Sequence, residues 1–156
     1  MKRISFDEIW QELTRILREL GFENSIAKRC AYIFTENTCD GVASHGLNRF
    51  TSFVSAVRTG LINTRVETEL VRSLGAIEQW DGRRGVGPLN AEKTMKRAIE
   101  LSHSHGLGCV GLRNTNHWMR GWTYGLLAAE AGCIGICWYP YYQPIFPGTG
   151  LRLMFA

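Results

Sequence analysis

Apolar residues recur at helical spacing over the first sixty residues, and this pattern predicts three amphipathic helices. The first is expected to begin at a capping box of Ser5 and Glu8, because a hydroxyl and a carboxylate at this spacing can each satisfy a free backbone amide. Gly21 is expected to end this helix, since glycine readily adopts the left-handed conformation. Asn24 or Ser25 is then predicted to cap the second helix.

The third helix is predicted to carry a polar motif, Gly-Val-Ala-Ser-His-Gly-Leu-Asn-Arg-Phe at 41–50. Ser44 is expected to cap this helix and Gly60 to close it. At about 100° per residue, the apolar side chains gather on one side of such a helix. His45 and Arg49 project away from that side, so both are expected on a polar face.

Beyond residue 63 the pattern becomes mixed. Helical spacing predicts helices at 88–105, with a proline in the first turn, and at 124–131. Short segments with β-branched, aromatic or uniformly apolar residues predict strands at 65–72, 74–80, 107–112 and 133–138. The fold class is therefore expected to be mixed α and β.

Three stretches of different character follow from this pattern. Residues 1–63 are expected to form a helical domain, and residues 64–138 to form the first part of a second domain. The remaining stretch, 139–156, contains three of the four prolines and has neither helical nor strand periodicity. It is interpreted as a tail that departs from the rest of the chain.

Composition indicates an ordinary soluble globular domain, because 45% of the 156 residues are hydrophobic and 21% are charged. No apolar run has the length of a membrane span and the start does not resemble a signal peptide, so a cytoplasmic location without membrane association is expected. The five cysteines are an odd set without a C-x-x-C motif, and they are interpreted as small hydrophobic residues. The net charge of +4 comes from scattered residues, which does not favour nucleic-acid binding and would suit small anions.

The stretch containing Ser44, His45 and Arg49 is a candidate site. Histidine exchanges a proton near neutral pH, and arginine binds a carboxylate with two parallel hydrogen bonds. A helix N-terminus would add amide donors. Together these groups could bind an anionic carbonyl compound and protonate its oxygen, although the same pattern also fits a solvated helix start.

A second candidate site is the stretch 114–121, Asn-Thr-Asn-His-Trp-Met-Arg-Gly, which follows a predicted strand and precedes a predicted helix. Loops at strand ends often carry functional residues. Asn116, His117 and Arg120 are the polar candidates. The alternative is an ordinary turn with a buried Trp118 and a hydrogen-bonded histidine.

Two other patterns are not interpreted as sites. His103 and His105 point in different directions on a helix and have no acidic or cysteine partner at a ligand spacing, so no metal is expected. The glycines at 82, 85 and 87 match neither a P-loop nor the G-x-G-x-x-G dinucleotide motif. A nicotinamide cofactor, if bound, would have to bind in another way.

Five stretches in order along the chain resemble the type-2 malate/L-lactate dehydrogenases, NAD(P)-dependent oxidoreductases unrelated to the Rossmann dehydrogenases. The matching stretches lie at 41–50, 73–81, 97–101, 116–121 and 135–138. The resemblance implies a helical domain joined to a cofactor domain with a largely antiparallel sheet, and a homodimer. Trp-Met-Arg after His117 indicates a branch acting on diketo sugar acids, because malate- and lactate-type members typically have Phe-Gly there.

The resemblance also implies roles for individual residues. His45 would be the proton donor to a ketone oxygen of a 2-oxo acid, with NADH or NADPH supplying hydride. Arg49 would orient the substrate carboxylate, and Ser44, His117 and Arg120 would line the same pocket. Asn116 and His117 are candidates for contact with the cofactor, and most other cofactor contacts are expected beyond Ala156.

Two departures from the family are visible. The resemblance is not apparent after Trp138, and family members are much longer, so a truncated chain is expected. A fragment of this kind could instead be non-catalytic and act only through association. Trp122 stands where close relatives have glycine, and it is expected to crowd the loop behind His117.

Overall fold

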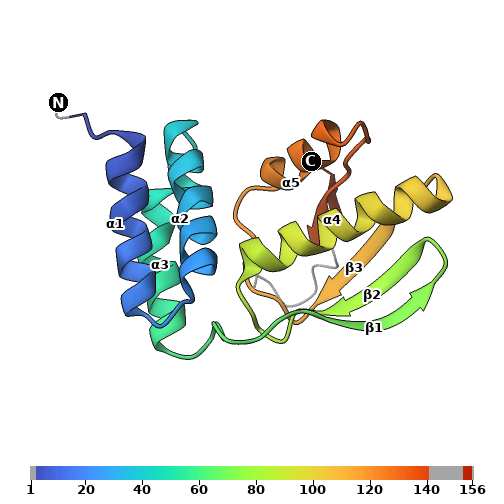
Figure 1. Ribbon diagram of the computed structural model, residues 1–156, viewed down its shortest axis with the longest axis horizontal. Coiled ribbons are helices and arrows are strands. Elements are labelled where there is room, and N and C mark those ends of the chain that lie inside the picture. Colours follow the sequence, from blue (N-terminus) through green and yellow to red (C-terminus); the bar gives the residue numbers. More distant parts are fainter. Residues whose placement is uncertain (1–2, 141–152, 156) are drawn as a thin grey trace.

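The computed structural model describes residues 3–140 and 153–155. Figure 1 shows a three-helix bundle beside a sheet that is covered by the long helix α4 (Gly87–His105). The helices of the bundle are α1 (Phe6–Glu19), α2 (Asn24–Cys39) and α3 (Leu47–Arg58). Three helices followed by alternating strands and helices confirm the expected mixed class.

The capping box at the start of α1 is confirmed. The Ser5 backbone amide donates to the Glu8 carboxylate at 2.9 Å, and the Glu8 amide donates to Ser5 Oγ at 3.2 Å. The predicted cap of α2 was wrong, because Glu23 precedes the helix and accepts from the amides of Ser25 and Ile26. A carboxylate at this position both satisfies the amides and interacts favourably with the positive end of the helix.

The predicted start of α3 was also wrong. Ser44 lies inside a short 3₁₀ turn, Ala43–His45, and α3 begins only at Leu47. The Leu47 amide donates to Thr38 Oγ1 of α2 at 3.0 Å, so a distant hydroxyl takes the place of the local serine. His45 and Arg49 therefore do not share one continuous helix.

The sheet has the order β1-β2-β3, and its strands are β1 (Glu69–Leu74), β2 (Ile77–Asp81) and β3 (Cys109–Arg113). β1 and β2 are antiparallel around a turn at Gly75. β2 and β3 are parallel, and the crossover between them is α4 (Gly87–His105), which has proline in its first turn as predicted. The largely antiparallel sheet expected from the resemblance thus contains a parallel pair in its described part.

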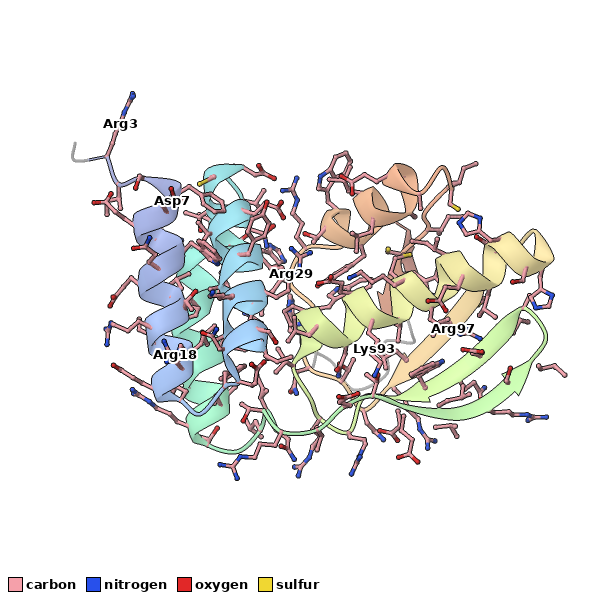
Figure 2. The ribbon with its side chains drawn as sticks, viewed as in Figure 1. Arg3, Asp7, Arg18, Arg29, Lys93 and Arg97 are labelled. Atoms are coloured by element: carbon pink, nitrogen blue, oxygen red, sulfur yellow. The ribbon has the colours of Figure 1, made fainter. Side chains whose placement is uncertain are left out.

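Helix α4 buries polar side chains where apolar ones were predicted. The helical spacing of apolar residues within 88–105 predicts Met95 and Ile99 on the inward face, but both are only half-buried, whereas Glu92 is 8% exposed. Arg29 of α2 reaches Glu92 at 2.7 Å, which joins the bundle to α4 (Figure 2). On the sheet side, Arg97 binds the buried Glu78 of β2 through two hydrogen bonds of 3.0 and 2.8 Å. Ion pairing explains why these charges tolerate burial.

The strand predicted at 133–138 was wrong. After α5 (Trp122–Glu130), residues 134–137 form no strand, and only β4 (Trp138–Pro140) pairs with β5 (Leu153–Phe155). An apolar segment becomes a stable strand when a neighbour pairs with it and covers it. Ile134 is 94% exposed, so this segment has no such cover in the described part of the chain.

The predicted tail, 139–156, is described only in part. β4 extends into it and β5 lies within it, so the tail has some strand structure that its sequence pattern did not indicate. Residues 141–152 and Ala156 lie outside the described residues. The cofactor contacts expected beyond Ala156 are not tested by this structure and stay a prediction.

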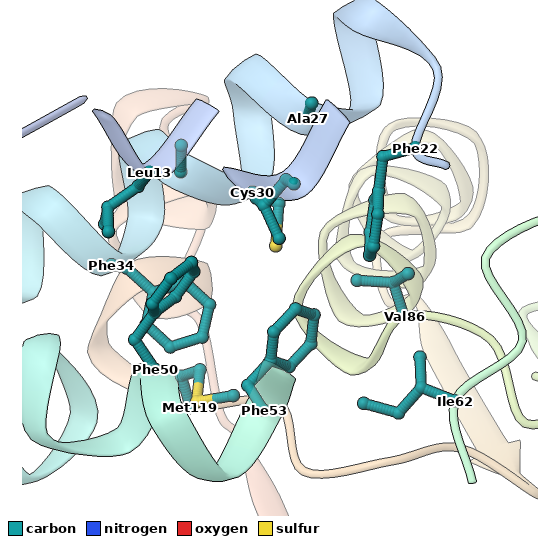
Figure 3. Packing of buried hydrophobic residues seen from close by; sticks show 12 residues of the cluster. Leu13, Phe22, Ala27, Cys30, Phe34, Phe50, Phe53, Ile62, Val86 and Met119 are labelled. Atoms are coloured by element: carbon teal, nitrogen blue, oxygen red, sulfur yellow. The ribbon is translucent and has the colours of Figure 1, made fainter. Parts of the chain in front are cut away.

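The core joins the bundle to the rest of the chain. Phe34 packs edge-on against Phe50, with ring centroids 5.1 Å apart, and also contacts Phe53 (Figure 3). The same cluster includes Val86 and Met119 from beyond residue 63. A domain boundary at that residue remains a prediction, because one hydrophobic cluster crosses it.

Candidate active site

His45 sits at the end of the 3₁₀ turn between α2 and α3 and is half-buried. Its Nδ1 atom lies 3.0 Å from Ser44 Oγ, so Ser44 contacts the imidazole instead of capping a helix. This contact leaves Nε2 as the ring nitrogen through which His45 can act on a ligand.

His117 lies on the loop between β3 and α5. The loop is fixed by Asn116, whose side-chain amide donates to the carbonyls of Arg84 and Gly85, each at 2.9 Å. Gly87 allows close packing of the two segments, because a Cβ atom there would lie 2.3 Å from the His117 carbonyl oxygen. The amide hydrogens of Asn116 are thus engaged by the protein, which leaves only its carbonyl oxygen for a cofactor.

The two histidines, far apart in sequence, face each other across the site. Their ring centroids are 5.6 Å apart and the planes are inclined by 37°. The backbone amide of Met119 donates to His117 Nδ1 at 2.9 Å. A neutral His117 therefore carries its proton on Nε2.

Both imidazoles are disfavoured as cations. Desolvation and the positive charges of Arg49 and Arg120 lower the pKa of His45 below its usual value. Desolvation of the ring, then Arg49 and His45, lowers the pKa of His117 to about 4, although part of its side chain is solvent-exposed. Both rings are therefore neutral in the free protein near pH 7.

The two arginines near the histidines differ in their partners. Arg120 Nη1 pairs with Asp40 at the end of α2 at 2.5 Å, which ties the His117 loop to the bundle. Arg49 is exposed and forms no ion pair with any carboxylate in the described part of the chain. Arg49 is consequently the better placed of the two to bind an incoming anion.

Trp122 does not crowd the loop, so that expectation was wrong. Its side chain is 61% exposed and lies under the guanidinium of Arg120, whose Cζ is 5.7 Å from the ring centroid. The position directly behind the loop belongs to Tyr124, which is 1% exposed, stacks on Trp118 and donates a hydrogen bond to its carbonyl. Trp122 begins α5 and points outward, which explains why a bulky side chain fits there.

Asp81 is a supporting residue that sequence reasoning missed. Its carboxylate accepts from the Arg83 amide and from the Asn114 side chain, both at 2.8 Å, and pairs with Arg113 at 3.1 Å. These contacts join the segment that follows β2 to the loop that carries His117. The only local signal was the Asp-Gly dipeptide at 81–82, which indicated a turn but not its tertiary partners.

The described residues contain no group of three or more His, Cys, Asp or Glu side chains arranged to bind a metal. His103 and His105 are exposed near the far end of α4. Cys30 lies in the core, where burial raises the pKa of its thiol to about 12, whereas Cys39 is exposed. Within the described part of the chain, no helix is long and apolar enough to cross a membrane.

Two surface hollows in the described residues lie away from the histidine pair. The larger, about 690 Å³, lies against α1 and the start of α2, between Trp10, Arg18 and Lys28. The smaller, about 320 Å³, lies beside the linker at Ile62 to Arg65. At the histidine pair, His45 is half-buried and His117 is exposed.

Comparison with known proteins identifies the family. The sequence profile of the malate/L-lactate dehydrogenases matches residues 4–155, nearly the whole chain. The chain belongs to this family. The match extends through 139–155 and so does not stop at Trp138, where the resemblance had been expected to end.

Similar proteins include a 2,3-diketo-L-gulonate reductase of Escherichia coli O1:K1, which is 48% identical over 136 residues. This alignment covers 87% of the chain and 41% of the reductase. Among solved structures, a malate dehydrogenase of Entamoeba histolytica has a TM-score of 0.85 at 30% identity, covering 90% of this chain and 39% of that one. A sulfolactate dehydrogenase of Methanocaldococcus jannaschii has a TM-score of 0.78 at 28% identity, covering 81% and 37%.

The chain therefore spans about two fifths of the length of the curated relatives that it matches. It likewise covers 38% and 39% of two of the solved malate dehydrogenase chains. These relatives are named as dehydrogenases of malate, lactate and sulfolactate and as a reductase of 2,3-diketo-L-gulonate.

Proposed function

We propose that the chain carries the proton-donating side of an NAD(P)H-dependent reductase site for a 2-oxo acid of the 2,3-diketo-L-gulonate type. The observation that carries this proposal is the approach of His45 to His117, at 5.6 Å between ring centroids, beside the exposed guanidinium of Arg49. The 48% identity to a 2,3-diketo-L-gulonate reductase supports this substrate class.

Geometry favours His45 over His117 as the proton donor. Protonating His117 at Nδ1 would break its hydrogen bond from the Met119 amide, and its pKa of about 4 opposes a second proton. Among the described residues, no backbone amide donates to the His45 ring; its Nδ1 faces a hydroxyl, which can accept as well as donate. Of the two facing rings, His45 is therefore the one that takes up and releases the proton.

Substrate charge would prepare His45 for this role. In the free protein, Arg49 disfavours the imidazolium. A carboxylate bound to Arg49 neutralises that charge and raises the pKa of His45, so the acid forms when an anion is present. Reduction adds a hydride to the carbonyl carbon and the His45 proton to its oxygen, giving an alcohol and regenerating neutral His45.

The described residues fit an anionic substrate better than a dinucleotide. Arg49 is available, and neutral His117 can donate from Nε2, but the amide hydrogens of Asn116 bind the 84–85 loop. A nicotinamide cofactor would supply the hydride. On this chain, His117 and the Asn116 carbonyl oxygen are the groups that would contact the cofactor, NADH or NADPH.

Two other functions are supported by specific observations. Resemblance to malate dehydrogenase structures, at 30% identity, supports a malate- or lactate-type 2-hydroxy acid dehydrogenase. The exposed side chains of Ile134, Ile136 and Trp138 support a non-catalytic function by association, with a copy of itself or a full-length relative.

Activity measurements distinguish these functions. The purified chain, and a chain extended after Ala156 with the remaining portion of a reductase relative, would be assayed for NADH and NADPH oxidation with 2,3-diketogulonate, oxaloacetate and pyruvate. We expect turnover of the diketo acid by the extended chain. Preference for oxaloacetate or pyruvate would favour the malate- or lactate-type function, and turnover by neither chain with any acid would contradict a reductase site.

The role of His45 requires a separate variant. His45→Ala in the extended chain should abolish turnover while leaving the thermal unfolding midpoint close to that of the parent. Control variant His105→Ala changes an exposed histidine of α4 and should leave turnover intact. Substantial turnover by His45→Ala would rule out His45 as the donor.

A further inference from the structure

Asn37 of α2 contacts both ends of the turn that carries His45. Its backbone carbonyl accepts from the Val42 amide at 2.9 Å, and its side-chain Nδ2 donates to the His45 carbonyl at 3.2 Å. The side chain is fully buried, at 0% exposure. One residue of α2 therefore spans the segment Val42–His45.

Thr38 contacts the same turn from the next position of α2. Its hydroxyl accepts from the Leu47 amide at 3.0 Å and donates to the Phe34 carbonyl at 2.7 Å. Gly46 allows this approach, because a Cβ atom there would lie 2.3 Å from Thr38 Oγ1. Asn37 and Thr38 together restrain the backbone on both sides of His45.

A contribution to the stability of the fold does not explain why the Asn37 side chain is buried. Its Oδ1 atom is buried without a hydrogen-bond partner among the described residues. A buried, unpaired acceptor is destabilising, whereas an apolar side chain of similar size would not be. The favourable contact of the side chain is the one it makes with the His45 carbonyl.

We propose that Asn37 and Thr38 are positioning residues that set the orientation of the His45 imidazole toward His117. This inference rests on the proposed function only where it gives His45 a catalytic role. The effect of Asn37 and Thr38 on the conformation of the turn does not depend on that role. Charged and titratable groups facing the imidazole are Arg49, Arg120 and His117. A change in the turn alters the distances from His45 to all three.

The test uses the chain itself and reads the orientation of His45 through its titration by NMR. Asn37→Leu removes the donor at similar volume, and we expect the pKa of His45 to rise toward its usual value and the amides of Val42 to Leu47 to exchange at least tenfold faster. The unfolding midpoint should stay at or above that of the parent, because the unpaired Oδ1 is also removed. A purely structural role predicts the opposite, a lower midpoint with an unchanged pKa.

Thr35→Val is the matched control. Thr35 is also fully buried in α2, but its hydroxyl donates within the helix, to the Ala31 carbonyl. It should leave the titration of His45 unchanged. If Asn37→Leu and Thr35→Val give the same His45 pKa and the same amide exchange, Asn37 does not position His45.

Two variants of Thr38 provide a second test if Asn37→Leu fails to fold. Thr38→Val removes the hydroxyl at constant shape and should speed exchange of the Leu47 amide, whereas Thr38→Ser should restore protection. Equal protection in Thr38→Val and the parent would overturn the proposal for this residue. Because these readouts need no turnover, they remain informative if the reductase assay fails.

Discussion

The backbone amide of Met119 donates to His117 Nδ1 at 2.9 Å, so the loop carrying His117 holds its own imidazole in the neutral form. Met119 has a φ of 68°, a conformation that L-residues rarely adopt. The Met119 side chain is buried in the hydrophobic cluster, which compensates for this conformation. Core packing thus determines the tautomer of a residue at the surface.

Acid sensitivity follows from this arrangement. The pKa of His117 is lowered from 6.5 to about 4, and that of His45 is also lowered. At pH values between about 4 and 6.5, the unfolded chain binds a proton at His117 that the folded chain does not, so the free energy of unfolding should rise with pH across this window. Urea unfolding at several pH values measures this slope.

The control for this prediction is His117→Gln, which should reduce the slope between pH 4 and 6.5. Ring resonances of the four histidines, assigned with single His→Gln variants, give the titration directly. A His117 resonance that titrates near 6.5 would contradict the prediction.

Arg49 should determine the affinity for small carboxylates. Charge-assisted hydrogen bonds contribute about 1.5–3 kcal/mol, which corresponds to about 10- to 150-fold in affinity. We expect Arg49→Gln to weaken the binding of a 2-oxo acid such as pyruvate by at least about tenfold. Titration of the histidine NMR shifts with pyruvate measures this affinity. Binding should also raise the pKa of His45 in the parent chain, and not in the variant.

Arg58→Gln is the matched control, because Arg58 is an exposed arginine at the other end of α3. It changes the net charge by the same amount without altering the site. If both variants weaken pyruvate binding equally, the effect reflects overall charge and Arg49 is not the clamp.

Local features of this fold could be predicted from the sequence, and tertiary contacts could not. The capping box of Ser5 and Glu8 and the proline-started α4 depend on neighbouring residues and are confirmed. The serine cap at Ser44 failed because the competing hydroxyl of Thr38 comes from α2. A propensity argument contains no information about such a partner.

For the candidate site, too, the sequence indicated individual residues but not the tertiary contacts between them. Residue chemistry drew attention to His45 and His117, but only the fold brings them face to face. The roles of Asp81 and Gly87 could not be predicted, because they depend on which loop lies opposite. The apolar segment 133–138 misled for a related reason, since its pattern indicates a strand while the described structure provides no strand beside 134–137.

Glu78 should be the most sensitive carboxylate of the sheet. It is 2% exposed and accepts hydrogen bonds from Arg97 and Trp80, and its pairing with Arg97 lowers its pKa. Glu78→Gln should lower the free energy of unfolding by about 2 kcal/mol, less than the ~3–5 kcal/mol of a fully buried pair, because solvent reaches Arg97. Urea unfolding at pH 7 measures the loss.

Glu67→Gln is the comparison for that loss. Glu67 also pairs with a cation of α4, Lys93, at 3.1 Å, but its side chain is 88% exposed. The expected loss is below about 0.5 kcal/mol, as for other surface pairs. Similar losses in the two variants would mean that burial of Glu78 does not strengthen its interaction with Arg97.

Gly87 should be intolerant of any side chain. A Cβ atom at this position would lie 2.3 Å from the His117 carbonyl oxygen and 2.4 Å from that of Asn116, and both neighbours are backbone atoms that cannot rotate away. Gly87→Ala should therefore lower the free energy of unfolding by about 1–3 kcal/mol and displace the His117 loop. Displacement should bring the pKa of His117 back toward its usual value.

Gly125→Ala tests whether this effect is specific to the loop contact. Gly125 lies within α5, and a Cβ atom there meets nothing within 4 Å. Alanine is favoured over glycine inside helices, so this variant should be stabilised by about 0.5–1 kcal/mol, with an unchanged His117 titration. If Gly87→Ala instead retains the parent's stability and a His117 pKa near 4, close packing against the 116–117 backbone does not position His117.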